Sequence, residues 1–234
     1  MKLYKKIESN GFPMKRLYHL PLSPFCRKIR LVLAEKKLEV DLIEELVWEG
    51  RLDFLRLNPA AKVPVLIIGD LVLSDSTAIF EYLEEVYPFP ALLPEGPAER
   101  AEARRLTFWF DDKFHSEVTS KLLYQRITKK LSRIGHPDST IIKAGVKALK
   151  FHFEYLDYIL ERRRWLAGDK MTIADFSGAA HFSTLDYIGD IDWSCSYHIK
   201  NWYEKIKSRP AFRSLLSDYL PGFHPPEHYS DLDF

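Results

Sequence analysis

Residues 63–79 read VPVLIIGDLVLSDSTAI, and this stretch decides the fold class of the first half of the chain. Two apolar runs flank Gly69-Asp70, a dipeptide typical of tight turns, so the stretch predicts an antiparallel hairpin. Asp75-Ser76 follows directly, and residues of these types cap the N-terminus of a helix, which we expect to run to Tyr87. The stretch therefore predicts a ββα unit.

The residues before the hairpin supply a second unit. Ser23-Pro24 predicts a helix start, because serine is a preferred N-cap and proline is preferred at the first helical position. The other elements that the pattern predicts here are strands over 16–22 and 40–47 and a short helix over 51–57. Right-handed crossovers can assemble this βαβ, short-helix and ββα order into one mixed sheet flanked by helices. We therefore expect a thioredoxin-like α/β domain over 14–87, preceded by an N-terminal extension over 1–13.

The second half of the chain has a different pattern. Four prolines within 88–97 predict a linker between compact domains. Beyond it we expect an all-helical domain over 98–220, and its helices are predicted over 99–133 with a break, 139–164, 173–187 and 197–208. The last stretch, 221–234, contains three prolines and a glycine, so we expect an extended tail.

The length, composition and charge of the chain exclude several classes of protein. The chain has 234 residues, 46% of them apolar, and 34 basic against 33 acidic side chains, so a global field that attracts nucleic acid or an anionic membrane is not expected. The apolar stretch over 63–73 is too short to span a bilayer, and the N-terminus lacks the apolar core of a secretory signal. Two cysteines give no disulfide framework. We expect a cytoplasmic protein that does not insert into membranes.

Four motifs in register link the two halves. They are Ser23-Pro24-Phe25, Val63-Pro64-Val65-Leu66, Asp75-Ser76-Thr77-Ala78-Ile79, and Leu166-Ala167-Gly168-Asp169 leading to Thr172-Ile173-Ala174-Asp175. In order and spacing they resemble the glutathione transferase superfamily over residues 14–215. The resemblance implies the cytosolic glutathione transferase fold and a homodimer.

The resemblance also implies a glutathione site. Ser23 would donate a hydrogen bond to the thiolate, Pro64 would be cis, and Val63 would offer backbone contacts to the peptide of glutathione. Asp75 and Ser76 would open a helix, whose first N–H groups and the Ser76 hydroxyl would hold the γ-glutamyl carboxylate. Each of the capping residues has a purely structural alternative, and many members carry Glu or Gln in place of Asp75, which puts glutathione affinity in doubt. Glutathione is thus a possible ligand only.

Two further groups of residues are candidates for chemistry: a cysteine and a pair of histidines. Cys26, near a helix N-terminus and beside basic residues, could be an acidified thiol of a thiol-disulfide exchanger. The cysteine-type members of the superfamily, however, carry cysteine at the position of Ser23. His224 and His228 lie four apart, but the intervening prolines prevent a helix from aligning them. We expect no metal site.

Three features are not required by a transferase and are candidate partner-binding elements. The first is a basic face on the helix expected over 99–133, at i, i+3, i+4 and i+7, formed by Arg126, Lys129, Lys130 and Arg133. The second is Trp48, expected in a loop, where a large aromatic side chain can anchor a partner. The third is the terminal segment with Asp231 and Asp233, which mixes acidic and apolar groups. A solvated helix face, a packed tryptophan and an inert tail are the structural alternatives.

Five longer segments narrow the resemblance. They are LPLSPFCRKIRLVLAEKKLE, RRWLAGD, LDYIGDIDW, KSRPAFR and HYSDLDF. They resemble an alphaproteobacterial branch of the superfamily that binds and organises filaments of the tubulin-like division GTPase FtsZ. This resemblance implies a division-site protein with weak or absent glutathione chemistry. An active transferase that uses Ser23 is the alternative, and the Cys26 exchanger ranks third.

Overall fold

The computed structural model describes residues 14–232 and divides them into two compact units, one ending at Pro90 and one beginning at Ala91. Asp233, one of the expected partner-binding residues, and the extension over 1–13 lie outside the described residues. Within the described part of the chain, no helix is both long and apolar enough to cross a membrane.

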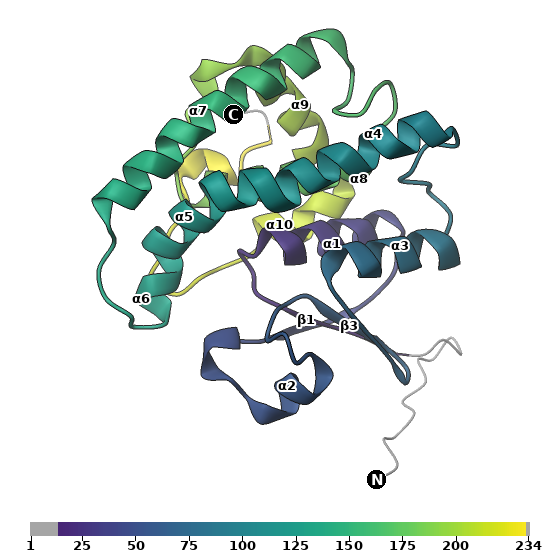
Figure 1. Ribbon diagram of the computed structural model, residues 1–234, viewed down its shortest axis with the longest axis vertical. Helices are drawn as coiled ribbons and strands as arrows, with labels where there is room; N and C mark the ends of the chain where they lie inside the picture. The colour runs from purple at the N-terminus through teal and green to yellow at the C-terminus, as the bar shows by residue number, and fades with distance from the viewer. Residues whose placement is uncertain (1–13, 233–234) are drawn as a thin grey trace. The chain divides into compact units, whose positions relative to one another are not determined.

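The first unit is built around a four-stranded sheet in the order β2-β1-β3-β4. Its elements are β1 (Lys15–His19), α1 (Pro24–Glu35), β2 (Asp41–Glu44), η1 (Val47–Glu49), α2 (Leu52–Leu57), β3 (Val65–Ile68), β4 (Leu71–Ser74) and α3 (Ser76–Val86). β1 pairs with β2 in parallel and with β3 antiparallel, and β4 pairs antiparallel with β3. Helices α1 and α3 cover one face of the sheet, and α2 lies on the other side (Figure 1). This order confirms the expected thioredoxin-like plan.

The second strand is shorter than the sequence pattern indicates. It ends at Glu44, and Val47–Glu49 forms a 3-10 turn instead of continuing the strand. The buried carboxylate of Glu45 forms an ion pair with Arg51, 2.7 Å away, which folds the chain back after the strand. The expectation of a strand over 40–47 was therefore too long, because a contact across six residues is not visible in a local apolar pattern.

The second unit is helical. Its elements are α4 (Pro97–Phe108), η2 (Trp109–Thr119), α5 (Ser120–Leu123), η3 (Tyr124–Thr128), α6 (Lys129–Leu131), α7 (Ser139–Arg162), α8 (Ile173–Tyr187), η4 (Trp193–Cys195), α9 (Tyr197–Lys207), η5 (Pro210–Phe212), α10 (Arg213–Leu216) and η6 (Glu227–Tyr229). The run from α4 to α6 stays helical, and η2 and η3 are stretches with π-helical hydrogen bonding. The break expected in this run is thus a change of hydrogen-bond pattern, not an interruption.

Helix α8 is the centre of the second unit, because each of its residues is buried. It starts with a capping box, in which the Thr172 side chain accepts from the backbone of α8 and the Asp175 carboxylate accepts from the Thr172 backbone at 2.8 Å. The neighbouring strand-like bridge between Trp165 and Gly168 closes the turn that leads into it. The sequence motif at 166–175 therefore positions the central helix.

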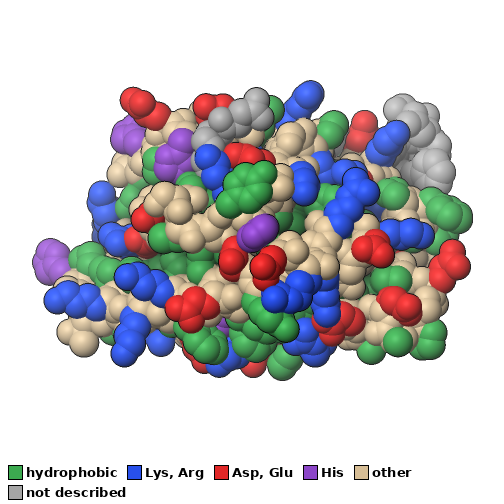
Figure 2. Space-filling view, turned by 90° about the horizontal axis from the view of Figure 1, so that it is seen from above, with side chains coloured by type: hydrophobic (Ala, Val, Ile, Leu, Met, Phe, Trp, Pro, Cys, Tyr) green, Lys and Arg blue, Asp and Glu red, His purple; other side chains and the backbone are tan. Residues whose placement is uncertain are grey.

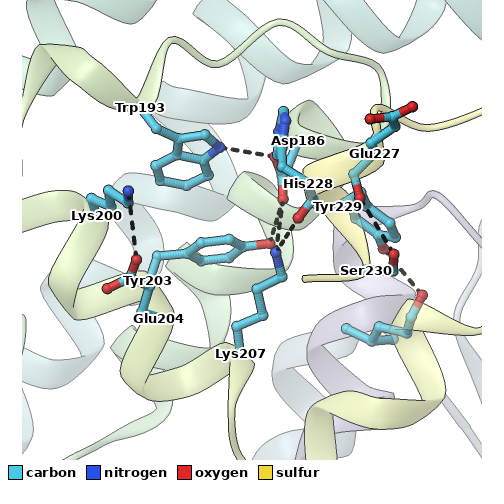
Figure 3. A network of polar contacts seen from close by, with 11 residues as sticks. Asp186, Trp193, Lys200, Tyr203, Glu204, Lys207, Glu227, His228, Tyr229 and Ser230 are labelled. Atoms are coloured by element: carbon cyan, nitrogen blue, oxygen red, sulfur yellow. Dashed lines mark hydrogen bonds and ion pairs between the residues drawn. The ribbon is translucent and has the colours of Figure 1, made fainter. Parts of the chain in front are cut away.

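The tail differs from the sequence expectation, which was an extended segment. Its 3-10 turn η6 holds Tyr229, which is 1% exposed. The Tyr229 hydroxyl donates to the carbonyl of Leu215 at 3.1 Å, and its ring lies 5.2 Å from that of Tyr187. His228 in the same turn bonds to Asp186 at 2.9 Å (Figure 3). The tail is thus packed on the helical unit through His228 and Tyr229, and the residues from Ser230 to Leu232 are exposed.

Candidate functional site

The strand register brings the expected glutathione-site residues to one edge of the sheet. Tyr18, near the end of β1, pairs with Val65 at the start of β3, and Val65 pairs with Ser74 at the end of β4. Ser23 follows β1, Pro64 precedes β3 and Asp75 follows β4, so all three segments lie at this edge of the sheet. Adjacent strands lie about 4.8 Å apart, so the three segments are neighbours in space.

Ser23 starts α1 as expected. Its hydroxyl oxygen accepts from the backbone N–H of Cys26 at 3.4 Å, which makes it the N-cap. An N-cap hydroxyl uses its oxygen as acceptor and keeps its own hydrogen to donate. The capping role and a bond from Ser23 to an incoming anion are therefore compatible, and the helix N-terminus favours negative charge there.

The peptide bond between Val63 and Pro64 is cis, as the family resemblance implied. The turn before it is held by Asn58, whose side chain donates to the carbonyl of Lys62 at 2.7 Å and accepts from the N–H of Ala60 at 3.2 Å. Asn58 is buried and was not singled out from sequence. The Asn58-Pro59 dipeptide was interpreted only as a helix end, whereas its side chain fixes the approach to Val63.

Asp75 caps α3 with its own carboxylate. One oxygen accepts from the N–H of Thr77 at 2.7 Å and of Ala78 at 3.4 Å, and the residue adopts a φ of 74°. Ser76 beside it is 5% exposed. A carboxylate of the protein thus already occupies the positive end of α3, where the γ-glutamyl carboxylate of glutathione would bind.

Trp48 lies in η1, in a turn that the structure closes firmly. The guanidinium of Arg51 donates to both oxygens of Glu45, at 3.2 Å from Nε and 2.7 Å from Nη2. Gly50 ends the turn in the left-handed region, with a φ of 61°. The Glu45 carboxylate raises the pKa of Arg51. Because β1 and β2 are parallel and His19 pairs with Glu44, the half-buried Trp48 follows the same sheet edge as Ser23.

His19, the last residue of β1, is a feature of this edge that sequence reasoning missed. It is 6% exposed, and burial together with the positive charges of Arg30 and Arg27 lowers its pKa to about 4. Its ring is therefore neutral at physiological pH. The only available signal was a histidine after Leu17 and Tyr18, four residues before Ser23, where a packed core histidine is the ordinary interpretation.

Cys26 is not the activated thiol considered from sequence. Its side chain is fully buried, and burial raises its pKa to about 11. A thiol with this pKa is protonated at neutral pH, and only the thiolate is nucleophilic. Cys26 packs as an apolar side chain, and the exchanger hypothesis is wrong on this point.

The basic face expected on the helix over 99–133 is largely engaged within the second unit. Arg126 forms a bidentate ion pair with Asp190, with 2.6 Å from its Nε to the carboxylate. The ammonium of Lys129 donates to the carbonyl of His136 at 3.1 Å, and that of Lys130 lies 4.5 Å from the centre of the Phe223 ring. These cations stabilise the unit.

Arg133 does not share that helix face. Helix α6 ends at Leu131, and Arg133 has a φ of 56°. The N–H groups of Arg133 and Ile134 bond back to the carbonyls of Lys130 and Lys129, at 3.3 and 3.0 Å, which is a helix C-cap. The expectation of four residues on one face was wrong here, because the helix stops before its last member.

Asp231 lies on the packed tail rather than on a free one. It lines a hollow of about 760 Å³ in the second unit, together with residues of the 191–194 segment, α9 and η6. The carboxyl-terminal half of the expected acidic pair, Asp233, is outside the described residues. A sequence-only view could not place Asp231, since the packing of Tyr229 determines where it lies.

Comparison with known proteins agrees with this geometry. The family model described as "Glutathione S-transferase, N-terminal domain" matches residues 17–97, and "Glutathione S-transferase, C-terminal domain" matches residues 123–210. The chain belongs to the glutathione S-transferase family. The two matched ranges include the sheet edge with the cis-proline and the central helix α8.

Known relatives differ in how similar their sequences are to the chain. FtsZ-localized protein A of Caulobacter vibrioides is 45% identical over 94% of this chain and 98% of its own length. Glutathione S-transferase 3 of Zea mays is 32% identical, over 92% of this chain and 97% of its own length.

Solved structures give the same picture. FzlA from C. crescentus matches with a TM-score of 0.92 and 45% identity, covering 94% of this chain and all of that one. A glutathione S-transferase from Rhodospirillum rubrum matches with a TM-score of 0.91 and 48% identity over 94% of this chain and 100% of that chain. The sequence-based recognition of the superfamily and of the FtsZ-related branch is thereby confirmed.

Proposed function

We propose that this glutathione S-transferase family member is a cell-division protein that binds and organises FtsZ filaments, with weak or no glutathione chemistry. The observation that carries the proposal is the 45% identity to FtsZ-localized protein A over nearly the full length of both chains. The proposed location is the cytoplasm at the division site.

The Trp48 turn supports the proposal as a candidate contact. A half-buried tryptophan on a turn closed by the Glu45–Arg51 ion pair offers aromatic area without much loss of chain entropy on binding. Lys130 and Arg133 are exposed in the second unit, and Asp231 is exposed on the packed tail. We retain these residues, with Arg126, Lys129 and Asp233, as the proposed partner-binding set.

Co-sedimentation tests the proposal and the role of Trp48. We expect the purified chain to pellet with GTP-assembled FtsZ and to stay in the supernatant with unassembled FtsZ. Trp48→Ala should weaken filament binding by about thirtyfold, because a central aromatic anchor contributes about 2 kcal/mol or more. Leu52→Ala is the matched control, since Leu52 is 73% exposed and lies just after the turn. A wild-type chain that stays in the supernatant with filaments at low salt would contradict the proposal.

We also propose that the chain forms a homodimer. Phe108, Phe151 and Tyr158 are 67%, 54% and 60% exposed, an unusual exposure for aromatic side chains. The Trp109 and Tyr155 rings, 4.5 Å apart, join the end of α4 to α7, so these exposed rings come from adjoining helices. Light scattering that gives twice the chain mass of 27.4 kDa would support this, and a monomer at micromolar concentration would refute it.

Calorimetry tests the glutathione part of the proposal. Because Asp75 places a carboxylate on the first amides of α3, we expect glutathione to bind with a Kd of about 1 mM or weaker. Ser23→Ala should leave that weak affinity within about twofold, since it removes a thiol contact and not the carboxylate contacts. Micromolar binding that Ser23→Ala weakens would instead favour the active transferase, for which the Ser23 hydroxyl at the start of α1 is the supporting feature.

A further inference from the structure

A second basic surface lies on α7, in a place that the sequence pattern did not single out. It consists of Lys143, Lys147 and Lys150, which we call the lysine face; all three side chains are exposed. Their spacing of i, i+4 and i+7 puts them on one side of the helix over a rise of about 10 Å. No acidic residue occurs between 139 and 153, so the charge of the lysine face is not diluted along the helix.

The opposite side of α7 is fixed against the core. Leu149 is 5% exposed and Leu156 is fully buried, and Gly145 packs so closely that a Cβ there would lie 2.9 Å from the Leu122 side chain. These contacts leave α7 little freedom to rotate about its axis. The packing therefore fixes the rotation of α7 and keeps the lysine face in solvent.

The lysine face lacks internal partners within residues 14–232. None of the three ammonium groups forms a hydrogen bond or an ion pair there, and Glu154, four residues after Lys150, does not pair with it in the described structure. One electrostatic contact is present: hydrogen bonds from Ser194 are the main cause of the lowered pKa of Asp192, and the charge of Lys150 adds to it. This differs from Arg126 and Lys129, which are engaged by groups of their own unit.

The arrangement costs stability in the free protein. Lys143 and Lys147 are like charges at i, i+4, and Lys147 and Lys150 are like charges at i, i+3, and such pairs destabilise a helix. Within the described residues, only the carboxylate of Asp192 offsets this repulsion, and it acts on Lys150 alone. A bound segment with negative charges would offset it, because it would place a carboxylate near each ammonium group.

We propose that the lysine face binds an acidic polypeptide segment of a partner protein. The inference does not depend on FtsZ binding, because none of the three lysines belongs to the proposed FtsZ-binding set and the test uses a peptide without FtsZ. In the face of the molecule seen in Figure 2, basic and acidic side chains are interspersed, so recognition of a charged partner depends on local groups of residues and not on a field of one sign. Its length matches about three to four residues of an extended peptide, which rises about 3.3 Å per residue.

The size of the lysine face favours a polypeptide over other polyanions. Membrane-binding basic clusters usually contain about four to eight Lys or Arg residues, and three fall short of that. Duplex DNA carries a charge about every 1.7 Å and requires a wider positive field. The formal charge of +1 and the acidic residues of the second half of α7 do not supply one.

Fluorescence anisotropy tests the proposal with a labelled peptide of alternating glutamate and serine, at low ionic strength. The variant is K143Q/K147Q/K150Q, and the matched control is K62Q/K170Q/K205Q, which removes the same charge from three scattered exposed lysines. We expect the first variant to bind about tenfold more weakly than the wild type and the second to change less than twofold, since three exposed charge pairs together give about this factor. Circular dichroism should show that both variants fold.

Each other outcome would overturn the proposal. Equal weakening in the two variants would mean that only the net charge matters. Absence of wild-type binding would mean that the lysine face does not hold an acidic peptide. Stronger, lysine-dependent binding of phosphatidylglycerol vesicles or of duplex DNA than of the peptide would assign the surface to a membrane or to nucleic acid. A glutamine-serine peptide that binds equally well would exclude charge recognition.

Discussion

Asp186→Ala should lower the free energy of unfolding by about 3 to 5 kcal/mol, because it leaves a buried cation without its counter-ion. Asp186 is fully buried in α8 and its oxygens accept from Trp193 Nε1 and His228 Nε2, each at 2.9 Å, and from the Tyr203 hydroxyl at 3.3 Å. The Lys207 ammonium, also fully buried, lies 3.9 Å from the same carboxylate. Figure 3 shows that these groups come from η4, α9 and the tail turn. One side chain therefore ties three segments to the central helix.

The loss of unfolding free energy in Asp186→Ala should depend on pH, and its direction follows from the pKa of Lys207. Burial lowers the pKa of Lys207 to about 8, although Asp186 opposes the shift. Between pH 8 and the ordinary lysine value, the unfolded chain binds this proton more than the folded chain does, so the contribution of Lys207 to stability rises with pH. Removal of Asp186 lowers this pKa further. The destabilisation by Asp186→Ala should therefore be largest near neutral pH and smaller near pH 10.

Urea denaturation followed by tryptophan fluorescence measures the effect. Glu227→Ala is the control, because Glu227 is an exposed carboxylate in the same tail turn and its removal should change stability by about 0.5 kcal/mol or less. A loss below about 1 kcal/mol for Asp186→Ala, or a loss that grows between pH 7 and 10, would show that the buried network does not hold Lys207 as described.

Local signals in the sequence predicted much of the first unit. The N-cap at Ser23, the turn at Gly69-Asp70 and the cap at Asp75 each depend on residues within four positions, and the structure has all three. Capping and turn preferences depend on residues that are neighbours in the chain, so they can be predicted from a single sequence. The convergence of these segments then follows from the strand order.

The predictions of the surface features failed because these features depend on residues far away in the sequence. The basic face was derived as if all its cations pointed to solvent, whereas Arg126 pairs with Asp190, 64 positions away. The tail was derived as extended from its prolines, whereas Tyr229 finds Tyr187 and Leu215 in other helices. Helical periodicity predicts which side of the helix a side chain lies on, but not which residues of other segments contact it. The lysine face was missed for the same reason, since only the packing shows which cations lack partners.

Asp175→Ala should be about as destabilising, by roughly 3 to 5 kcal/mol, through loss of acceptors instead of loss of a counter-ion. Asp175 is fully buried at the start of α8, and its oxygens accept from the Leu166 N–H at 2.9 Å, the Thr172 N–H at 2.8 Å and Trp202 Nε1 at 2.9 Å. Without the carboxylate, three buried donors from the preceding turn and from α9 lose their acceptor. Each unsatisfied buried donor costs about 1 to 3 kcal/mol.

Asparagine separates hydrogen bonding from charge at this position. In Asp175→Asn one oxygen can still serve Leu166 and Trp202, but the amide nitrogen then faces the Thr172 N–H, donor against donor. We expect a loss smaller than that of Asp175→Ala but still above about 1 kcal/mol. Asp192→Ala is the matched control, because Asp192 is an exposed N-cap that should cost about 1 kcal/mol or less.

The pH dependence of Asp175 has the opposite sign to that of Lys207. Burial raises the pKa of Asp175 to about 6, although its donors oppose the rise. Between the ordinary aspartate value and pH 6 the folded chain binds more protons than the unfolded chain, so the stabilisation from this group is complete at low pH and declines as the pH rises to 6. The difference between wild type and Asp175→Ala should therefore narrow from pH 4 to pH 6 and stay constant above about pH 7. A difference that widens over that interval would mean that the donors around Asp175 outweigh its burial, and that the carboxylate is held charged at the start of α8.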